Sequence, residues 1–259
     1  MIKVEKNFED VPNILKSKNR KEAFLNNVAD KAYNHGKTLY KSTQIFNTLK
    51  SIYNLKCAYC EESLLDAPKH IEHYRPKDYY YWLSYSWDNL LFCCTSCNSV
   101  KTTNFKIENS KINYNNECFL DIHGLGAGYD ELEKPLIINP EKDDVLDMIV
   151  FDCNGKMSSA NNRVSHTINI ACKLNREELV QRRIKILNKF KITVEEHLLY
   201  YQKKGDLSRF CPDIKLFIEE CNKKNEFYSF RYFILNHIEV FFDDLVMRKI
   251  LKVLIQKLK

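Results

Sequence analysis

Two Cys-x-x-Cys pairs constrain the fold of this chain more than any other feature. The pairs are Cys57/Cys60 and Cys94/Cys97, and 33 residues separate them. Each pair fits a turn that directs both sulfurs at one point, and four thiolates complete a tetrahedral zinc site with no open coordination position. An iron–sulfur cluster or a redox dithiol would use the same residue type, but neither accounts for the long intervening segment. We therefore predict a structural zinc site, with Cys93 outside it because it breaks the two-residue spacing.

The remaining composition is that of an ordinary globular protein. The chain has 259 residues, 44% of them hydrophobic and 29% charged, with a formal net charge of +6. This charge is a mild indication of a polyanionic partner such as nucleic acid, but a solvated lysine-rich surface accounts for it more simply. Residues 1–10 contain no apolar signal core, and no apolar run approaches the roughly 20 residues that span a bilayer. We therefore expect a cytoplasmic protein without a membrane partner.

The other cysteines are isolated in the sequence. Without a secretory signal, disulfides are not expected, and a free cysteine is commonly a small buried apolar residue. This expectation applies to five positions: Cys118, Cys153, Cys172, Cys211 and Cys221.

The pattern of apolar residues divides the chain into four segments. We expect residues 1–56 to be an N-terminal helical segment and residues 57–105 to be a core that holds the two Cys pairs. Residues 106–165 read as an extension of strands and loops, and residues 166–259 as a mainly helical region that could dock a partner.

The extension contains four local signals. LIINP (136–140) and DMIVFD (147–152) read as strands, Asn154-Gly155 as a turn, and GLGAG (124–128) as a flexible loop.

The last segment carries strong helical periodicity. Residues 176–204 follow a 3.6-residue pattern, and breaks are expected at Gly205 and Pro212. The long segment 227–258 then presents one wide apolar stripe. A stripe of this kind indicates packing in the core of the helical region, with docking of a partner as the alternative. Its residues are Phe227, Phe230, Ile234, Ile238, Phe241 and Leu245.

The segment between the Cys pairs carries residues suited to phosphodiester cleavage. Glu72 and His73 are adjacent in HIEHYRPK (70–77), which reads as a strand that ends in a turn at Pro76. Asn89 follows in a loop, and Asn98 comes directly after the second Cys pair. Hydrolysis needs a base with a pKa near neutral, which histidine provides, and a hard divalent cation, which carboxylate and amide oxygens bind. A positive side chain can also steady the charge that develops on the phosphate.

This arrangement resembles the HNH family of nucleases, which is built on a ββα-metal finger. The resemblance implies an α+β fold, with a ββα-metal HNH core stabilised by the four-Cys zinc site, flanking helices and a mainly helical C-terminal region. It implies His73 as the general base and Asn89 as the loop residue that holds the base in position. Glu72 and Asn98 would be the ligands of a catalytic Mg²⁺ or Mn²⁺. The chain departs from the commonest family pattern at two positions, because Glu72 stands in place of an aspartate and Asn98 in place of a histidine.

Four further residues are candidate substrate contacts. Lys101 could approach the substrate phosphate, and Arg75 and Lys77 could contact phosphates or be solvated. His70 shares a strand face with Glu72 and could be a second metal ligand, a substrate contact or a structural residue. The aromatic run at 79–82 could stack on bases, but packing in the core fits aromatic residues better.

Further sequence patches extend the resemblance to the PtuB-like subfamily of HNH proteins, which occurs in Septu-type and some retron-linked antiphage systems. This resemblance implies a PtuA-like ATPase as the partner and, in a retron setting, a complex with a reverse transcriptase and its noncoding RNA. The chain has no Walker motif, so any ATP binding would belong to that partner. The patches are CAYCE (57–61), HIEHYRPK (70–77), WDNLLFCCTSCNSVK (87–101), PLIINPEKDD (135–144) and HTINIACKLNR (166–176).

Two classes of function remain open at this point. The first is a metal-dependent endonuclease that cleaves DNA, or alternatively host tRNA or other RNA. The second is a zinc-ordered module that binds nucleic acid or assembles with a partner without catalysis. A binding module has no need of Glu72, His73, Asn89 and Asn98 together, so the complete set favours the enzyme.

Overall fold

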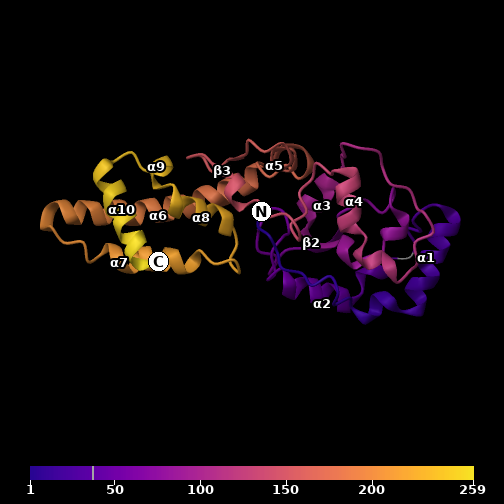
Figure 1. The fold of residues 1–259 in the computed structure, drawn as a ribbon. Helices are drawn as coiled ribbons and strands as arrows, with labels where there is room; N and C mark the ends of the chain where they lie inside the picture. Colours follow the sequence, from indigo (N-terminus) through magenta and orange to yellow (C-terminus); the bar gives the residue numbers. More distant parts are fainter. Residues whose placement is uncertain (37) are drawn as a thin grey trace.

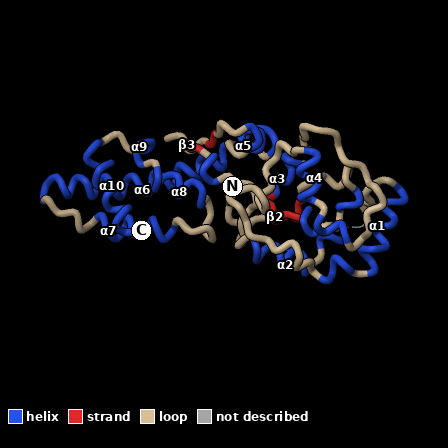
Figure 2. Tube along the Cα trace, viewed as in Figure 1, coloured by secondary structure: helices blue, strands red, loops and turns tan. Residues whose placement is uncertain are grey.

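The structure is a computed structural model that describes residues 1–36 and 38–259. Two parts lie along one long axis (Figure 1), one with the N-terminal helices and a small sheet, the other with the helices of the C-terminal third. Helices make up most of the C-terminal part, whereas the first part combines helices, long loops and short strands (Figure 2). The predicted α+β class and the mainly helical C-terminal region are confirmed.

Two α-helices lie in the N-terminal segment, as the apolar spacing indicated. Ser42 caps the second helix by accepting a hydrogen bond from the Ile45 N–H at 3.4 Å. This helix buries Ile45 and Leu49 and ends shortly before Cys57. The elements are η1 (Asn13–Lys16), α1 (Lys18–Asp30), η2 (Leu39–Lys41) and α2 (Thr43–Ile52).

A β-hairpin and one helix form the centre of the first part. Strand β1 (Lys69–His73) pairs antiparallel with β2 (Leu90–Cys94), and α3 (Thr95–Lys101) follows β2 directly. The register sets Lys69 opposite Cys94 and His73 opposite Leu90. Cys94 and His73 therefore lie at opposite ends of the hairpin, which we call the zinc end and the base end.

The connection between the two strands contains η3 (Tyr81–Leu83) and η4 (Trp87–Asn89). The strand predicted over residues 70–77 ends at His73 instead. The next two N–H groups, of Tyr74 and Arg75, donate to the carbonyl and side-chain oxygens of Asn89 at 2.9 and 2.7 Å, so the chain leaves the ladder there.

The extension differs from its prediction in two places. LIINP forms no strand; its backbone is satisfied in part by side chains, as where the Ile138 N–H donates to Thr167 Oγ1 at 2.9 Å. GLGAG is no flexible loop, because helix α4 begins within it and the Gly126 N–H donates to Asp88 Oδ2 at 2.7 Å. A Cβ at Gly126 would lie 2.7 Å from that oxygen, so the close approach requires glycine.

The turn signal at Asn154-Gly155 is confirmed. Gly155 has φ +72° and lies between the two strands of a small hairpin, the first of which falls inside the predicted DMIVFD strand. The elements of the extension are η5 (Asp121–Gly124), α4 (Gly126–Glu133), η6 (Leu146–Met148), β3 (Val150–Phe151), β4 (Met157–Ser158) and α5 (Asn162–His166).

The C-terminal part is a group of helices. Gly205 ends the longest of them with φ +70°, as predicted, whereas Pro212 lies in the first turn of α7, where proline is tolerated, and causes no break. Among the described residues, no helix is both long and apolar enough to cross a membrane. The elements are the π-helix η7 (Thr167–Ala171), α6 (Glu177–Lys204), α7 (Phe210–Glu220), α8 (Tyr228–Asn236), α9 (Ile238–Phe241) and α10 (Leu245–Leu258).

The apolar stripe of segment 227–258 is core. Its first five residues are buried and only Leu245, at 68% exposure, is not. Phe230, for example, packs on Phe151 with ring centroids 4.9 Å apart. Docking of a partner by this helical region stays a hypothesis. The stripe does not support it, because buried residues cannot contact a partner. Among the five isolated cysteines, only Cys172 is buried as expected. Cys211 and Cys221 are partly exposed, and the expectation of burial was wrong for Cys118 and Cys153, which are exposed.

Polar contacts join the two parts around residues 56–63. Lys56 Nζ donates to the carbonyls of Lys223 and Asn225, and the Ser229 N–H donates to Glu61 Oε2 at 2.9 Å. Arg182 of α6 pairs with Glu62 and, at 2.8 Å, with Glu226. The first Cys pair thus lies where the two parts of the molecule meet.

Candidate active site and zinc site

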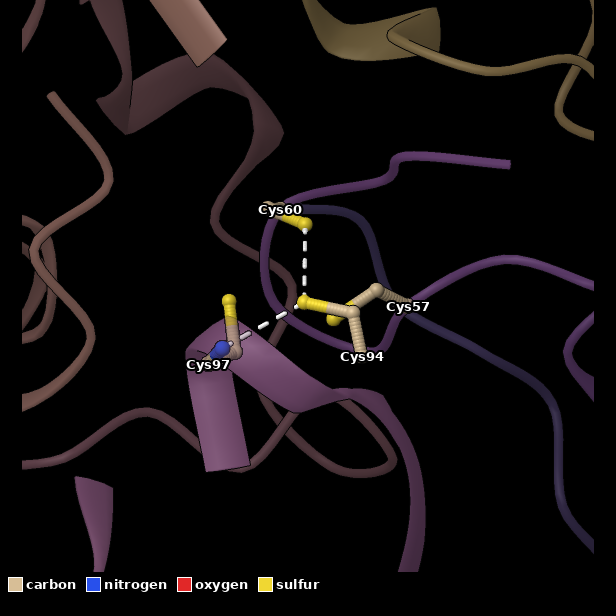
Figure 3. Close-up of side chains that lie close together, drawn as sticks. All are labelled: Cys57, Cys60, Cys94 and Cys97. Atoms are coloured by element: carbon tan, nitrogen blue, oxygen red, sulfur yellow. Dashed lines mark hydrogen bonds between the residues drawn. The ribbon is translucent and has the colours of Figure 1, made fainter. Parts of the chain in front are cut away.

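The four cysteines of the two pairs converge, as predicted. Their Sγ atoms all lie within 4.8 Å of one another and are buried, with Cys57 and Cys60 on a turn after α2 and Cys94 and Cys97 at the start of α3 (Figure 3). Tetrahedral ligands about 2.3 Å from a zinc ion lie roughly 3.8 Å apart. The Sγ atoms of Cys60 and Cys94 are 3.8 Å apart. The donor set and its spacing therefore fit a structural zinc ion.

Two further residues border the four-Cys cluster. Cys93 Sγ is 3.6 Å from Cys57 Sγ, although Cys93 does not belong to the group of four. Arg176, the residue before α6, directs Nη2 at Cys97 Sγ (3.4 Å) and Cys94 Sγ (3.7 Å). Four thiolates around Zn²⁺ carry a net charge of −2, and a guanidinium beside them offsets part of it.

At the base end, the His73 ring is buried and held by a single hydrogen bond. His73 Nε2 lies 3.0 Å from the carbonyl oxygen of Ser84, which can only accept. Nε2 therefore carries the proton, and the lone pair is on Nδ1, for which no described residue provides a hydrogen-bond partner. Burial lowers the pKa of His73 to about 3, so the ring is neutral at pH 7.

Asn89 connects the two segments that flank this hydrogen bond. Its Oδ1 accepts from the Arg75 N–H at 2.7 Å, and its Nδ2 donates to the carbonyls of Arg75 (3.1 Å) and Leu83 (3.2 Å). Arg75 is two residues after His73, and Leu83 directly precedes Ser84. A buried amide in this position ties together the two backbone segments that flank the His73–Ser84 hydrogen bond.

Glu72 and Asn98 approach the same region from a strand and a helix. Glu72 Oε1 accepts a hydrogen bond from Lys101 Nζ at 2.8 Å, and burial raises the pKa of its carboxyl while the Lys101 charge opposes that shift. Asn98 is partly exposed and lies three residues before Lys101 on α3, so both share one helix face. One carboxylate and one amide oxygen suit Mg²⁺, which commonly keeps several waters and takes few protein ligands.

Two of the predicted phosphate contacts are buried instead. Lys101 is fully buried, with Nζ bound to Glu72 and, at 2.7 Å, to the His73 carbonyl oxygen. Arg75 is 2% exposed and pairs with Asp130 at 2.7 Å and Glu133 at 3.0 Å. Both charges are neutralised inside the protein, so the structure contradicts phosphate contacts for these two residues and gives them internal ion pairs.

The other two candidate substrate contacts are accessible. Lys77 is partly exposed, with Nζ 5.1 Å from the centroid of the Tyr33 ring. His70 is also partly exposed, but its Nε2 lies 3.0 Å from Thr95 Oγ1 and it pairs across the hairpin with Cys93, toward the zinc end. His70 therefore lies nearer the zinc end of the hairpin than His73 does.

Sequence reasoning missed two residues that contact His73. Tyr40, of η2, packs edge-on against the His73 ring with centroids 4.5 Å apart and an interplanar angle of 76°. Ser84 contributes only its backbone carbonyl. Neither has a sequence signal, because both reach His73 through tertiary packing. The predicted core role of the aromatic run holds for Tyr80 and Trp82, which are 1% exposed, while Tyr79 is 50% exposed.

Comparison with protein families identifies the class that this hairpin, helix and site define. The model of the family described as HNH endonuclease matches residues 57–104, which include both Cys pairs and all four predicted catalytic residues. Residues 57–104 thus form an HNH domain.

Comparison with curated proteins shows similarity to proteins of the Septu type. The chain is 31% identical to Septu protein PtuB of Bacillus mycoides (strain KBAB4) over 196 residues, which is 66% of this chain and 63% of that protein. A PtuB of Bacillus thuringiensis is 38% identical over 71 residues, covering 27% of this chain and 28% of that protein. Septu protein PtuA of the same B. mycoides strain is 26% identical over 157 residues, or 55% of this chain and 20% of PtuA. The chain thus spans less than two thirds of the length of each of these relatives.

Proposed function

We propose that the chain is a metal-dependent HNH endonuclease that hydrolyses phosphodiester bonds in DNA. The observation that carries this proposal is the orientation of His73. Its Nε2 proton is committed to the Ser84 carbonyl, so Nδ1 is the atom that can accept a proton, and the Asn89 network holds the ring in place. A zinc-ordered binding module has no need of a buried, neutral imidazole with one nitrogen left free.

The proton transfer at His73 follows from this orientation. A water molecule attacks the scissile phosphorus, and Nδ1 takes one of its protons as the new P–O bond forms and the bond to the leaving oxygen breaks. The pKa of His73 in the free protein, about 3, makes it a weak base. A bound phosphate beside the ring supports the reaction, because a negative charge favours the imidazolium and raises this pKa toward the working pH.

Glu72 and Asn98 are the residues that we assign to a catalytic Mg²⁺ or Mn²⁺. A cation held by these two residues would supply positive charge at the phosphate when bound. Lys101 positions the Glu72 carboxylate by its hydrogen bond at 2.8 Å. The four-Cys cluster fits zinc and is separate in role, since four sulfur ligands leave no position for substrate.

We also propose an antiphage role with a PtuA-like ATPase as the partner. The support is similarity to proteins named as Septu PtuA and PtuB. An unregulated nuclease would damage its host, which is consistent with control by a second protein.

Cleavage assays on plasmid DNA and on total tRNA test this proposal. Wild-type protein, with and without the PtuA-like protein of its own operon, is incubated with Mg²⁺, with Mn²⁺ or without added metal. We expect metal-dependent cleavage of DNA, lost in Asn98→Ala and retained in Asn47→Ala, a matched exposed asparagine on α2. Cleavage of tRNA alone would replace DNA by RNA as the substrate. Absence of cleavage on both substrates in every condition would contradict the enzyme.

A further inference from the structure

Three lysines contribute positive charge near His73, and they differ in how far they are exposed to solvent. Lys41, Lys77 and Lys101 all act electrostatically on the His73 ring. Lys101 is fully buried and bound to Glu72. Lys41 is exposed, Lys77 is partly exposed, and neither forms an ion pair with any residue that the structure describes. Only Lys41 and Lys77 of these three can therefore meet an anionic substrate.

Both lysines are placed by tyrosines that form one array with the base. Lys41 Nζ is 5.8 Å from the centroid of the Tyr40 ring, and that ring packs edge-on against His73 at 4.5 Å. Lys77 Nζ is 5.1 Å from the centroid of the Tyr33 ring, which lies 6.3 Å from Tyr40. The ammonium groups of Lys41 and Lys77 thus lie near the packed rings of Tyr40 and Tyr33, and the Tyr40 ring contacts His73.

We propose that Lys41 and Lys77 bind backbone phosphates of the substrate strand next to the scissile bond, and that Tyr40, whose ring packs on His73, is a positioning residue that fixes the base relative to Lys41. This inference rests on the proposed nuclease function and deepens it. Tyr33 and Tyr40 are each 5% exposed, so their faces are not open to stacking on bases. Lysine binds phosphate as a point charge and reads no base edge there. Binding at this site is therefore independent of nucleotide sequence and strongly dependent on salt.

The test measures binding separately from cleavage. In a His73→Ala background without added divalent metal, affinity for two labelled DNA duplexes of unrelated sequence is measured over a series of salt concentrations. Each phosphate contact contributes about 0.9 to the slope of log K against log salt. We expect Lys41→Gln with Lys77→Gln to reduce the magnitude of the slope by about 2 on both duplexes. The matched control is Lys185→Gln with Lys249→Gln, which removes two exposed helical lysines from α6 and α10.

Three binding results would overturn the inference: an unchanged slope, an equal change in the control pair, or no salt-dependent binding at all. Cleavage by the wild type with metal is recorded in parallel. If the wild type cleaves and the Lys41/Lys77 variant matches the control, the inference fails while the proposed function stands. If the wild type does not cleave, the proposed function fails whatever the slopes show.

Tyr40 is tested by two substitutions in the otherwise native chain. Tyr40→Phe keeps the ring on His73 and is expected to retain kcat. Tyr40→Leu removes the ring edge and is expected to lower kcat more than it raises KM, with unchanged zinc content as the check on folding. A Tyr40→Leu protein that keeps its zinc and the wild-type kcat would show that Tyr40 does not position the base.

Discussion

The two ends of the β1–β2 hairpin hold their functional side chains in different ways. At the zinc end, four sulfurs converge on one point and a zinc ion can bind them directly. At the base end, roughly 13 Å away for strands of this length, His73 is oriented by one hydrogen bond to Ser84 and by the Asn89 network. The first end can be stabilised by metal ligation, whereas the second is held by tertiary packing. The first can therefore lose its metal and unfold, whereas the second can lose its chemistry while the fold remains.

Removal of the zinc ligands should have the largest effect of any change. Binding of structural zinc contributes about 10–16 kcal/mol in small zinc domains, and folding depends on it. We expect Cys97→Ser to abolish zinc binding and the cooperative unfolding transition of the HNH domain. Zinc analysis and circular dichroism measure both quantities. A folded Cys97→Ser protein without zinc would show that the cluster is dispensable.

At the base end, loss of the buried ion pair between Lys101 and Glu72 should have the second-largest effect on stability. Lys101→Met leaves the Glu72 carboxylate buried without its cation, and the loss of one partner of a buried pair costs about 3–5 kcal/mol. The double variant Glu72→Gln with Lys101→Met should recover part of this stability. Urea unfolding measures the loss. If Lys101→Met instead weakens DNA binding at unchanged stability, the lysine is a substrate contact after all.

Arg176 provides a weaker test of the zinc end. Its guanidinium lies 3.4 Å from Cys97 Sγ, and removal of such an outer partner typically lowers metal affinity 10- to 100-fold. We expect Arg176→Gln to release zinc faster to a chelator, with an unchanged circular dichroism spectrum. Arg182→Gln, which removes a guanidinium that pairs with Glu62 and Glu226, is the matched control. If both variants released zinc at the same rate, Arg176 would have no specific role in holding the zinc ion.

The smallest effect concerns pH at the base end. His123 Nδ1 accepts a hydrogen bond from the Trp87 N–H at 3.1 Å, and burial, with a further contribution from Lys16, lowers the pKa of His123 to about 4. The folded pKa lies below the unfolded value of about 6.5, so the unfolded chain binds the proton more readily and stability falls as the pH falls through that value. Lowering the pH from about 7.5 to about 5.5 should remove about 1.4 kcal/mol.

His123→Asn, which keeps an acceptor, should lose this share of the pH dependence. His35→Asn is the control because His35 is exposed. Urea unfolding at the two pH values measures the difference, and equal pH dependence in the wild type and His123→Asn would contradict the assignment.

The sequence predicted the two ends unequally, for physical reasons. Metal ligands carry their own spacing, so Cys57, Cys60, Cys94 and Cys97 were identified without a structure. The motif also indicated His73 and Asn89. The sequence did not show which groups Lys101 and Arg75 bind. A lysine or arginine near a catalytic residue can pair with a substrate phosphate or with a buried carboxylate, and local sequence does not distinguish the two. Asp130 and Glu133, which neutralise Arg75, lie more than 50 positions away in the chain.

The fold shows the same division. The helical character of residues 1–56 and of α6 followed from periodicity, and the end of α6 from Gly205. The absence of a strand at LIINP and the start of α4 inside GLGAG depend instead on tertiary partners. Asp88 and Thr167 supply those partners. Local pattern therefore predicted the long helices and failed where side chains from distant segments satisfy the backbone.

The most direct test of the account substitutes the base and leaves the zinc end intact. His73→Ala, His70→Ala and the wild type are compared for cleavage of DNA with Mg²⁺ and for zinc content. General-base catalysis contributes about 10² to 10⁴ in rate. We predict a loss of that size in His73→Ala, near-normal cleavage in His70→Ala and unchanged zinc in both. Equal cleavage by His73→Ala and the wild type would contradict the assignment of His73 as the base.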